Sequence, residues 1–214
     1  MIGKIFGKIR RKLHSPPAPP SSWDVYKDYV KVHPTAIIDP AASVKIFNPP
    51  VPPRICLEIG EGSHIFSTFA LLRPEAKITV GKRCQLGASH FVAAERITVG
   101  DDVLMAWGVT VMDTDAHSLE WEFRQHDVAR AYKDYIADPS NLIKTKDWSH
   151  VAVAAIDIAD RCWIGFNASI LKGVSVGNNA VIGACSVVVR NVPAFTLAAG
   201  NPAAAIKDLH QGNT

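Results

Sequence analysis

The sequence predicts an all-β fold, a parallel β-helix built of hexapeptide repeats, and three observations support this prediction. Large aliphatic residues recur at a fixed step of six through the C-terminal third, namely Ile158, Ile164, Ile170, Val176, Ile182 and Val188. A smaller residue follows each by four positions, namely Cys162, Ala168, Val174, Ala180, Ser186 and Val192. A step of six matches neither an amphipathic helix nor a lone strand. We therefore expect a triangular prism of 18-residue coils, three hexads each, with the aliphatic residues inside and the strands of successive coils paired in parallel.

The same ladder can be followed toward the N-terminus in shorter runs. Each run is predicted to be one coil: Val32, Ile38, Val44; Ile59, Ile65, Leu71; Val80, Leu86, Val92; and Val99, Met105, Val111. Between Val111 and Ile158 the spacing is 47 residues, which is not a multiple of six. Residues 113–155 are therefore predicted to leave the prism as a long loop, and such a loop usually serves function or a partner. After the last hexad we expect residues 198–209 to form a crossing loop and a short C-terminal helix.

The ends of the chain differ in composition from its body. Residues 1–22 contain a basic amphipathic stretch and a Pro-rich linker, residues 23–207 form the repeat domain, and residues 208–214 are a short tail. The first 13 residues carry five cations, so a net charge of +3 leaves −2 for the rest. Apolar residues in this stretch have helical spacing, which is typical of a peripheral contact with an anionic membrane or of a solvated or partner-packed tail. The body lacks the basic groove of a nucleic-acid-binding protein, so we expect no nucleic-acid partner.

The four cysteines show no metal-type or CxxC spacing. Core thiols in a reducing cytoplasm are the expectation. We therefore place the chain in the cytoplasm, with a possible attachment to the inner face of the membrane through residues 1–13.

The run from Ile158 to Lys207 resembles the C-terminal half of hexapeptide-repeat acetyltransferases, above all the sugar O-acetyltransferases related to the maltose and galactoside enzymes. WIGFNASILKGV, VIGACSVV and AAGNPA carry this resemblance, which covers roughly residues 32–207. It implies a left-handed parallel β-helix, a homotrimer, acetyl-CoA held between neighbouring prisms as the co-substrate, a histidine base and no required metal. The insertion from Asp127 to Asp147 resembles the longer loops of polysaccharide and O-antigen acetyltransferases, which favours a glycan acceptor.

The resemblance implies that His117, in MDTDAHSLEWEFR, is the general base. A hydroxyl is a poor nucleophile at neutral pH, so a neutral imidazole must take its proton as the oxygen attacks a thioester. A neighbouring carboxylate would fix the tautomer of the ring, and Asp115 and Asp113 are the local candidates. The alternative is that DTDAH is an ordinary polar loop in which the aspartates cap turns.

The same resemblance assigns contacts to both substrates. The donor contacts map onto Phe166, Ala184, Val189, Arg190 and Lys207. The two basic residues among them would meet phosphate charge or are ordinary surface charges. Relatives commonly carry a basic residue where this chain has Ala204, which removes one expected phosphate contact.

For the acceptor, the candidates are His90, Ser89, Trp121 and Arg124. His90 falls four positions after Leu86, where a small residue is expected, so it either faces a cleft or is packed. The rings of the extruded loop, Trp121 among them, either stack on a sugar or pack the loop onto the prism.

The predicted function is acetyl transfer to a sugar hydroxyl in surface polysaccharide or O-antigen biosynthesis. An N-acetyltransferase on the same scaffold is the main alternative. A zinc carbonic anhydrase would need convergence of His64, His90 and His117, but Glu122 stands where those enzymes carry a second histidine. A non-catalytic scaffold recruited to membranes is the third alternative.

Overall fold

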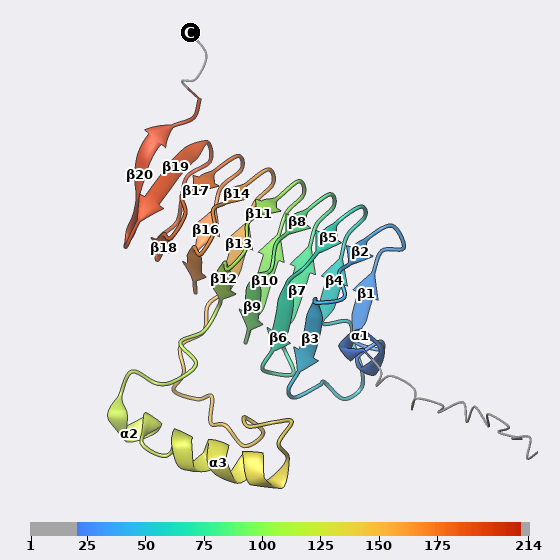
Figure 1. The fold of residues 1–214 in the computed structure, drawn as a ribbon. Coiled ribbons are helices and arrows are strands. Elements are labelled where there is room, and N and C mark those ends of the chain that lie inside the picture. Colours follow the sequence, from blue (N-terminus) through green and yellow to red (C-terminus); the bar gives the residue numbers. More distant parts are fainter. Residues whose placement is uncertain (1–20, 211–214) are drawn as a thin grey trace, which may run out of the picture.

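The computed structural model describes residues 21–210, which form a triangular prism of stacked coils with one long arm (Figure 1). The basic stretch at residues 1–13 and the linker up to residue 20 lie outside the described residues, as do residues 211–214. Each face of the prism is one sheet, and each coil adds one strand to each face. All strand pairs but the last are parallel, as the periodicity predicts.

The three sheets run the length of the prism. The first consists of β1 (Val30–Val32), β4 (Leu57–Ile59), β7 (Lys77–Val80), β10 (Arg96–Val99), β13 (Ile156–Ile158) and β16 (Ser175–Val176). The second consists of β2 (Ile37–Ile38), β5 (His64–Ile65), β8 (Gln85–Leu86), β11 (Leu104–Met105), β14 (Trp163–Ile164), β17 (Val181–Ile182), β19 (Thr196–Gly200) and β20 (Ala203–Asp208). The third consists of β3 (Ser43–Ile46), β6 (Thr68–Leu71), β9 (His90–Ala93), β12 (Thr110–Met112), β15 (Ser169–Leu171) and β18 (Val187–Val188).

On the first two faces the predicted ladder is confirmed residue by residue. Val32, Ile59, Val80, Val99, Ile158 and Val176 stack in register on the first face. Ile38, Ile65, Leu86, Met105, Ile164 and Ile182 do so on the second. From Ile59 onward these side chains are buried in the prism, where removal of apolar surface from water stabilises the stack.

On the third face two predicted positions are wrong. The buried residues in register with Val44 and Val111 are Phe69 and Phe91, not Leu71 and Val92. Their rings stack with centroids 5.1 Å apart. The corner that precedes Phe69 is two residues shorter than the corresponding corners of the other coils, and the corner that precedes Phe91 is one residue shorter. A shift of one residue turns a side chain to the opposite face of a strand. His90 is therefore an exposed residue outside the prism.

The predicted C-terminal helix is also wrong, because residues 203–208 form strand β20. This strand pairs antiparallel with β19, and the chain reverses at Gly200, whose φ is +104°. Without β20, the edge of β19 would leave unpaired backbone groups at the end of the prism. Strand β20 pairs with this edge and so satisfies backbone groups that an isolated short helix would leave to solvent.

Short helices lie at the start of the described chain and in the arm. Helix α1 (Ser22–Val25) begins with a capping box at Ser21, and the adjoining Trp23 ring packs edge-on against Phe69. Strand β12 ends at Met112 and β13 begins at Ile156, so residues 113–155 form the arm, which contains α2 (Trp121–Arg124) and α3 (Asp127–Ala137). No helix within residues 21–210 is long and apolar enough to cross a membrane.

Candidate functional site

Hydrogen bonds hold the arm at the point where it leaves the prism. Asp113 is fully buried, and its carboxylate accepts hydrogen bonds from the backbone N–H groups of Ala94 (2.6 Å) and Glu95 (2.9 Å). Burial raises the pKa of Asp113, although these N–H groups act in the opposite direction. Its backbone carbonyl also accepts from the N–H of Ala154 (2.9 Å), which ties the outgoing and returning strands together. Asp113 therefore anchors the arm.

Asp115 is also occupied away from His117. Its carboxylate lies 2.7 Å from the Lys172 ammonium group, and its backbone carbonyl accepts from the His117 N–H (2.7 Å). Between them, Ala116 adopts a left-handed conformation with φ of +60° and turns the chain. The structure thus brings neither predicted aspartate side chain to the imidazole.

The carboxylate that meets His117 belongs to Asp127, the first residue of α3. Its Oδ2 lies 2.5 Å from His117 Nδ1. Burial raises the pKa of Asp127, but hydrogen bonds from His117 and Lys146 outweigh it, so the pKa is held below its usual range. An ionised carboxylate only accepts, so Nδ1 carries the donated hydrogen and Nε2 is left as the free acceptor. This is the tautomer that a general base needs.

A cavity of about 330 Å³ lies between the arm and the prism, and the His117–Asp127 pair stands at its wall. Leu72 contributes from the prism, and Leu142 and Ile143 contribute from the segment after α3. Helix α3 itself contributes Val128 and Ala131 together with the charged Asp127, Arg130 and Asp134. Trp148 and Lys146 complete the polar end, and the Trp148 ring stacks against the Arg73 guanidinium at 5.7 Å. The imidazole thus borders a partly enclosed space that can exclude water from a reaction.

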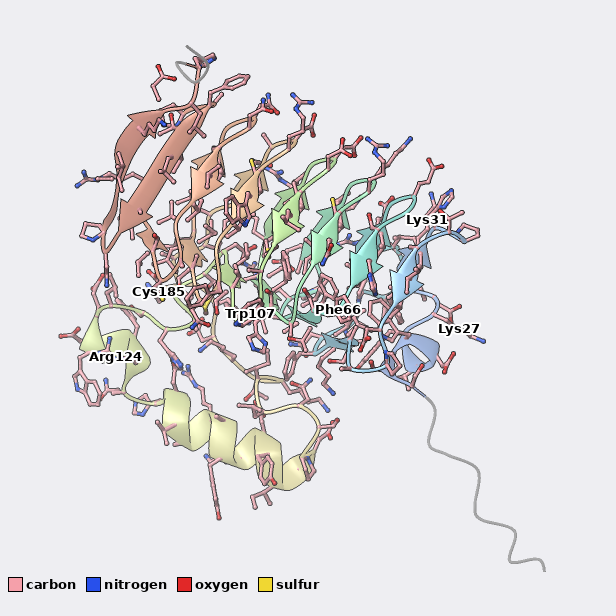
Figure 2. All side chains as sticks on the ribbon, turned by 45° about the horizontal axis from the view of Figure 1, so that its top comes forward. Lys27, Lys31, Phe66, Trp107, Arg124 and Cys185 are labelled. Carbon is pink, nitrogen blue, oxygen red and sulfur yellow. The ribbon has the colours of Figure 1, made fainter. Side chains whose placement is uncertain are left out.

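A second hollow, here called the corner groove, runs along the corner between the second and third sheets. Its volume is about 480 Å³, and its lining includes Trp107, Trp163, Phe166, Ala184 and Leu197. The Trp107 and Phe166 rings stack with centroids 5.9 Å apart, and Gly165 and Gly183 line the groove beside them without side chains. Figure 2 shows Trp107 between Phe66 and Cys185 along the prism.

Two of the five predicted donor residues, Phe166 and Ala184, line the corner groove. Val189 and Arg190 follow β18 and are exposed, but they do not line it. Lys207 is exposed on β20 and pairs in register with Leu197, so it borders the groove from the end of the prism. Sequence reasoning missed Trp107, although it follows Met105 by two positions, as Phe166 follows Ile164.

The predicted acceptor residues are scattered. His90 is exposed on β9, with Nδ1 2.8 Å from the Thr68 hydroxyl. Ser89 is buried, and its hydroxyl donates to the Ala106 carbonyl (2.8 Å), so its assignment to the acceptor is wrong.

The two acceptor candidates on the arm lie on α2, away from the cavity wall. Arg124 donates to the carbonyls of Ser118 (2.6 Å) and Leu119 (3.0 Å) and lies over the exposed Trp121 ring. Its guanidinium holds the turn before α2, and Figure 2 labels Arg124 on the part of the arm that contains this helix.

The three histidines of the zinc alternative occupy different parts of one chain. His64 lies on the second sheet, His90 on the third, and His117 on the arm. Within residues 21–210, no three His, Cys, Asp or Glu side chains are grouped as a metal site.

Comparison with known proteins identifies the repeat. The family of bacterial transferase hexapeptides (six repeats) matches residues 156–190, which span β13 to β18. Residues 156–190 are therefore hexapeptide repeats.

Relatives of this chain include acetyltransferases. Galactoside O-acetyltransferase of Escherichia coli K12 is 26% identical over 148 residues, which is 66% of this chain and 62% of the relative. The chain spans about half the length of the first curated relatives that it matches.

Two solved structures are also similar. One is the polySia-specific acetyltransferase NeuO, 25% identical, with a TM-score of 0.54 over 84% of this chain and 76% of that one. The other is AntD, an N-acyltransferase from Bacillus cereus in complex with dTDP and 3-hydroxybutyryl-CoA, 17% identical, with a TM-score of 0.62 over 88% of both chains. The fold is therefore a left-handed parallel β-helix.

Proposed function

We propose that the protein is an acetyl-CoA-dependent O-acetyltransferase that acetylates a sugar hydroxyl in the biosynthesis of a surface polysaccharide or O-antigen. The observation that carries this proposal is the His117–Asp127 pair at the wall of the arm cavity. Similarity to galactoside and polysialic acid O-acetyltransferases supports the reaction class and a glycan acceptor.

In the proposed reaction His117 is the general base. Nε2 accepts the proton of the sugar hydroxyl as its oxygen attacks the thioester carbonyl. The new C–O bond forms, the C–S bond breaks, and the coenzyme thiolate leaves with the proton that the imidazolium returns. Asp127 holds the ring orientation throughout and stabilises the imidazolium that forms.

The donor is proposed to bind in the corner groove. Its aromatic rings and the glycines among its lining residues suit a flat, partly apolar pantetheine arm. Lys207 at the end of the groove, and Arg190 beyond it, would meet the phosphates of the nucleotide portion.

The positions of the base and of the groove bear on assembly. The arm leaves the prism between β12 of the third sheet and β13 of the first, whereas the corner groove lies between the second and third sheets. These are different corners of the triangle, so a complete site requires the base of one chain beside the groove of another. A cyclic homotrimer meets this requirement with equivalent sites.

Thiol release from acetyl-CoA against a panel of sugars tests the proposal. We expect release with a hydroxyl acceptor and a loss of about 10²–10⁴-fold in kcat for His117→Ala. His126→Ala is the matched control, because His126 is exposed on the same arm and its side chain makes no capping hydrogen bond. Equal activity of His117→Ala and wild type would refute the assignment of the base.

The acceptor panel also distinguishes the main alternative. Thiol release with amino sugars and none with hydroxyl acceptors would assign N-acetylation instead. Acetyl-CoA is a cytoplasmic metabolite, so we propose the cytoplasm as the location, and cell fractionation with and without residues 1–13 tests peripheral membrane attachment.

A further inference from the structure

We infer that Lys146 is a positioning residue for the His117 base: its ammonium group shares the Asp127 carboxylate with the imidazole and places a positive charge beside the ring. This inference rests on the proposed function. Lys146 lies on the segment of the arm that returns from α3 to the prism, whereas Asp127 lies on α3 itself.

The geometry places all three groups around one oxygen atom. Lys146 Nζ lies 3.3 Å from Asp127 Oδ2, the same atom that accepts from His117 Nδ1, and 3.4 Å from Nδ1 itself. The Lys146 side chain is only 9% exposed, and its ammonium group lies 5.3 Å from the centre of the Trp148 ring. A cation this well covered by protein is screened less by solvent than a surface lysine.

Other charged groups also surround the pair, and one of them, Arg130, faces the same carboxylate. Arg130 of α3 lies 3.8 Å from the second oxygen of Asp127 and 4.0 Å from Asp147 of the returning strand. Asp134 accepts from the N–H and hydroxyl of Thr145, at 2.8 and 2.9 Å.

At the base of the arm, Asp115 is paired with Lys172. Lys146 lies 3.4 Å from the imidazole nitrogen, whereas Arg130 faces the other oxygen of Asp127.

The physical consequence is a balance between two opposite charges. A carboxylate bonded to Nδ1 stabilises the imidazolium, and a base that is already protonated cannot accept the hydroxyl proton. The ammonium group draws on the same carboxylate and repels a second positive charge at 3.4 Å. Lys146 thus offsets part of the stabilisation that Asp127 gives to the imidazolium.

The pH dependence of kcat/KM in the full-length protein tests this inference. In Lys146→Met, which keeps most of the length of the side chain without charge, we expect the acidic limb to move to higher pH by about 1 unit. Activity should be reduced near neutral pH and recover toward wild type in alkaline solution. Lys146→Arg restores a cation and should return the limb close to its wild-type position.

Lys144→Met is the matched control, since Lys144 is exposed two residues away on the same segment and should leave the profile unchanged. If Lys146→Met lowers activity equally at every pH, or if Lys146→Arg fails to restore the limb, Lys146 acts only in folding or binding and the inference is overturned.

NMR titration of the His117 ring supplies a second readout that needs no turnover. The midpoint should move to higher pH in Lys146→Met, and an unchanged midpoint overturns the inference. A failure of the proposed function looks different: His117→Ala would then retain activity, whatever the titration shows.

Discussion

The prism and the arm of this protein are held together by opposite means. In the prism, aliphatic side chains stack inside three parallel sheets, and the backbone of each coil pairs with the next. In the arm, the buried groups are largely polar: Asp113, Asp127 and Asp134 accept hydrogen bonds, and Asn141 donates to the Phe47 carbonyl (2.5 Å). A repeated apolar pattern therefore builds the support, and a non-repeating polar segment carries the candidate chemistry.

Helix α3 shows the contrast most clearly. Its buried positions are Asp127 and Asp134, whereas Val128, Tyr132, Tyr135 and Ile136 are more than half exposed. Apolar burial thus contributes little to its docking within one chain, and a few hydrogen-bonded pairs fix its place. Variants that disturb the apolar packing of the prism should leave the hydrogen bonds of the arm intact, and the reverse should also hold.

The largest expected effect is in the prism. Phe91→Ala removes a fully buried ring from the stack with Phe69 and should lower the free energy of unfolding by about 3–5 kcal/mol. Phe123→Ala on the arm removes a ring that is 39% exposed and should cost about 1 kcal/mol or less. Denaturant or thermal unfolding checks both, and equal losses would contradict the contrast between the two regions.

The next effect is on catalysis rather than stability. Asp127→Asn removes the charge that orients His117 and should lower kcat about 10²-fold with little change in Tm. Asp115→Asn should have a much smaller effect, because Asp115 pairs with Lys172 instead. Steady-state kinetics distinguish the two, and a larger loss for Asp115→Asn would return the orienting role to the residue closer in sequence.

The smallest expected effect is on the stability of the arm at acidic pH. The pKa of Asp127 is lowered in the folded chain, so its contribution to stability is complete above the unfolded value of about 3.9 and is lost as pH falls through the folded value. The pKa of Asp113 is raised, so its protonation on acidification favours the folded state.

Hydrogen exchange measured between pH 7 and pH 3 should therefore show the region of Asp127 opening at the acidic end while the base of the arm stays protected. In Asp127→Asn the exchange of this region should no longer show this dependence on pH. Simultaneous opening of both regions in the wild type would contradict the opposite directions of the Asp127 and Asp113 pKa shifts.

Much of the prism could be predicted from sequence because its geometry repeats. The step of six locates the inward residues of two faces and both ends of the arm, at Met112 and Ile156. It fails where a corner changes length, since nothing in the aliphatic spacing announces that Phe91 replaces Val92 as the inward residue.

The arm has no period from which contacts can be deduced. His117 and Asp127 are ten residues apart and meet only because a turn and a short helix intervene, so the nearer aspartates were the natural expectation. The corner groove is an intermediate case. Two of its lining residues, Phe166 and Ala184, were predicted donor contacts, and the recurring offset within the hexad also indicates Trp107.

The separation of base and groove onto different corners has a consequence for mixed populations of subunits. His117→Ala would lack the base but keep an intact groove, whereas Ala184→Trp would fill the groove but keep the base. Neither preparation alone should turn over, yet co-refolded assemblies should regain activity at each junction that joins the intact half of one to the intact half of the other. Complementation between two inactive variants is thus the expected consequence of the proposed sites between subunits.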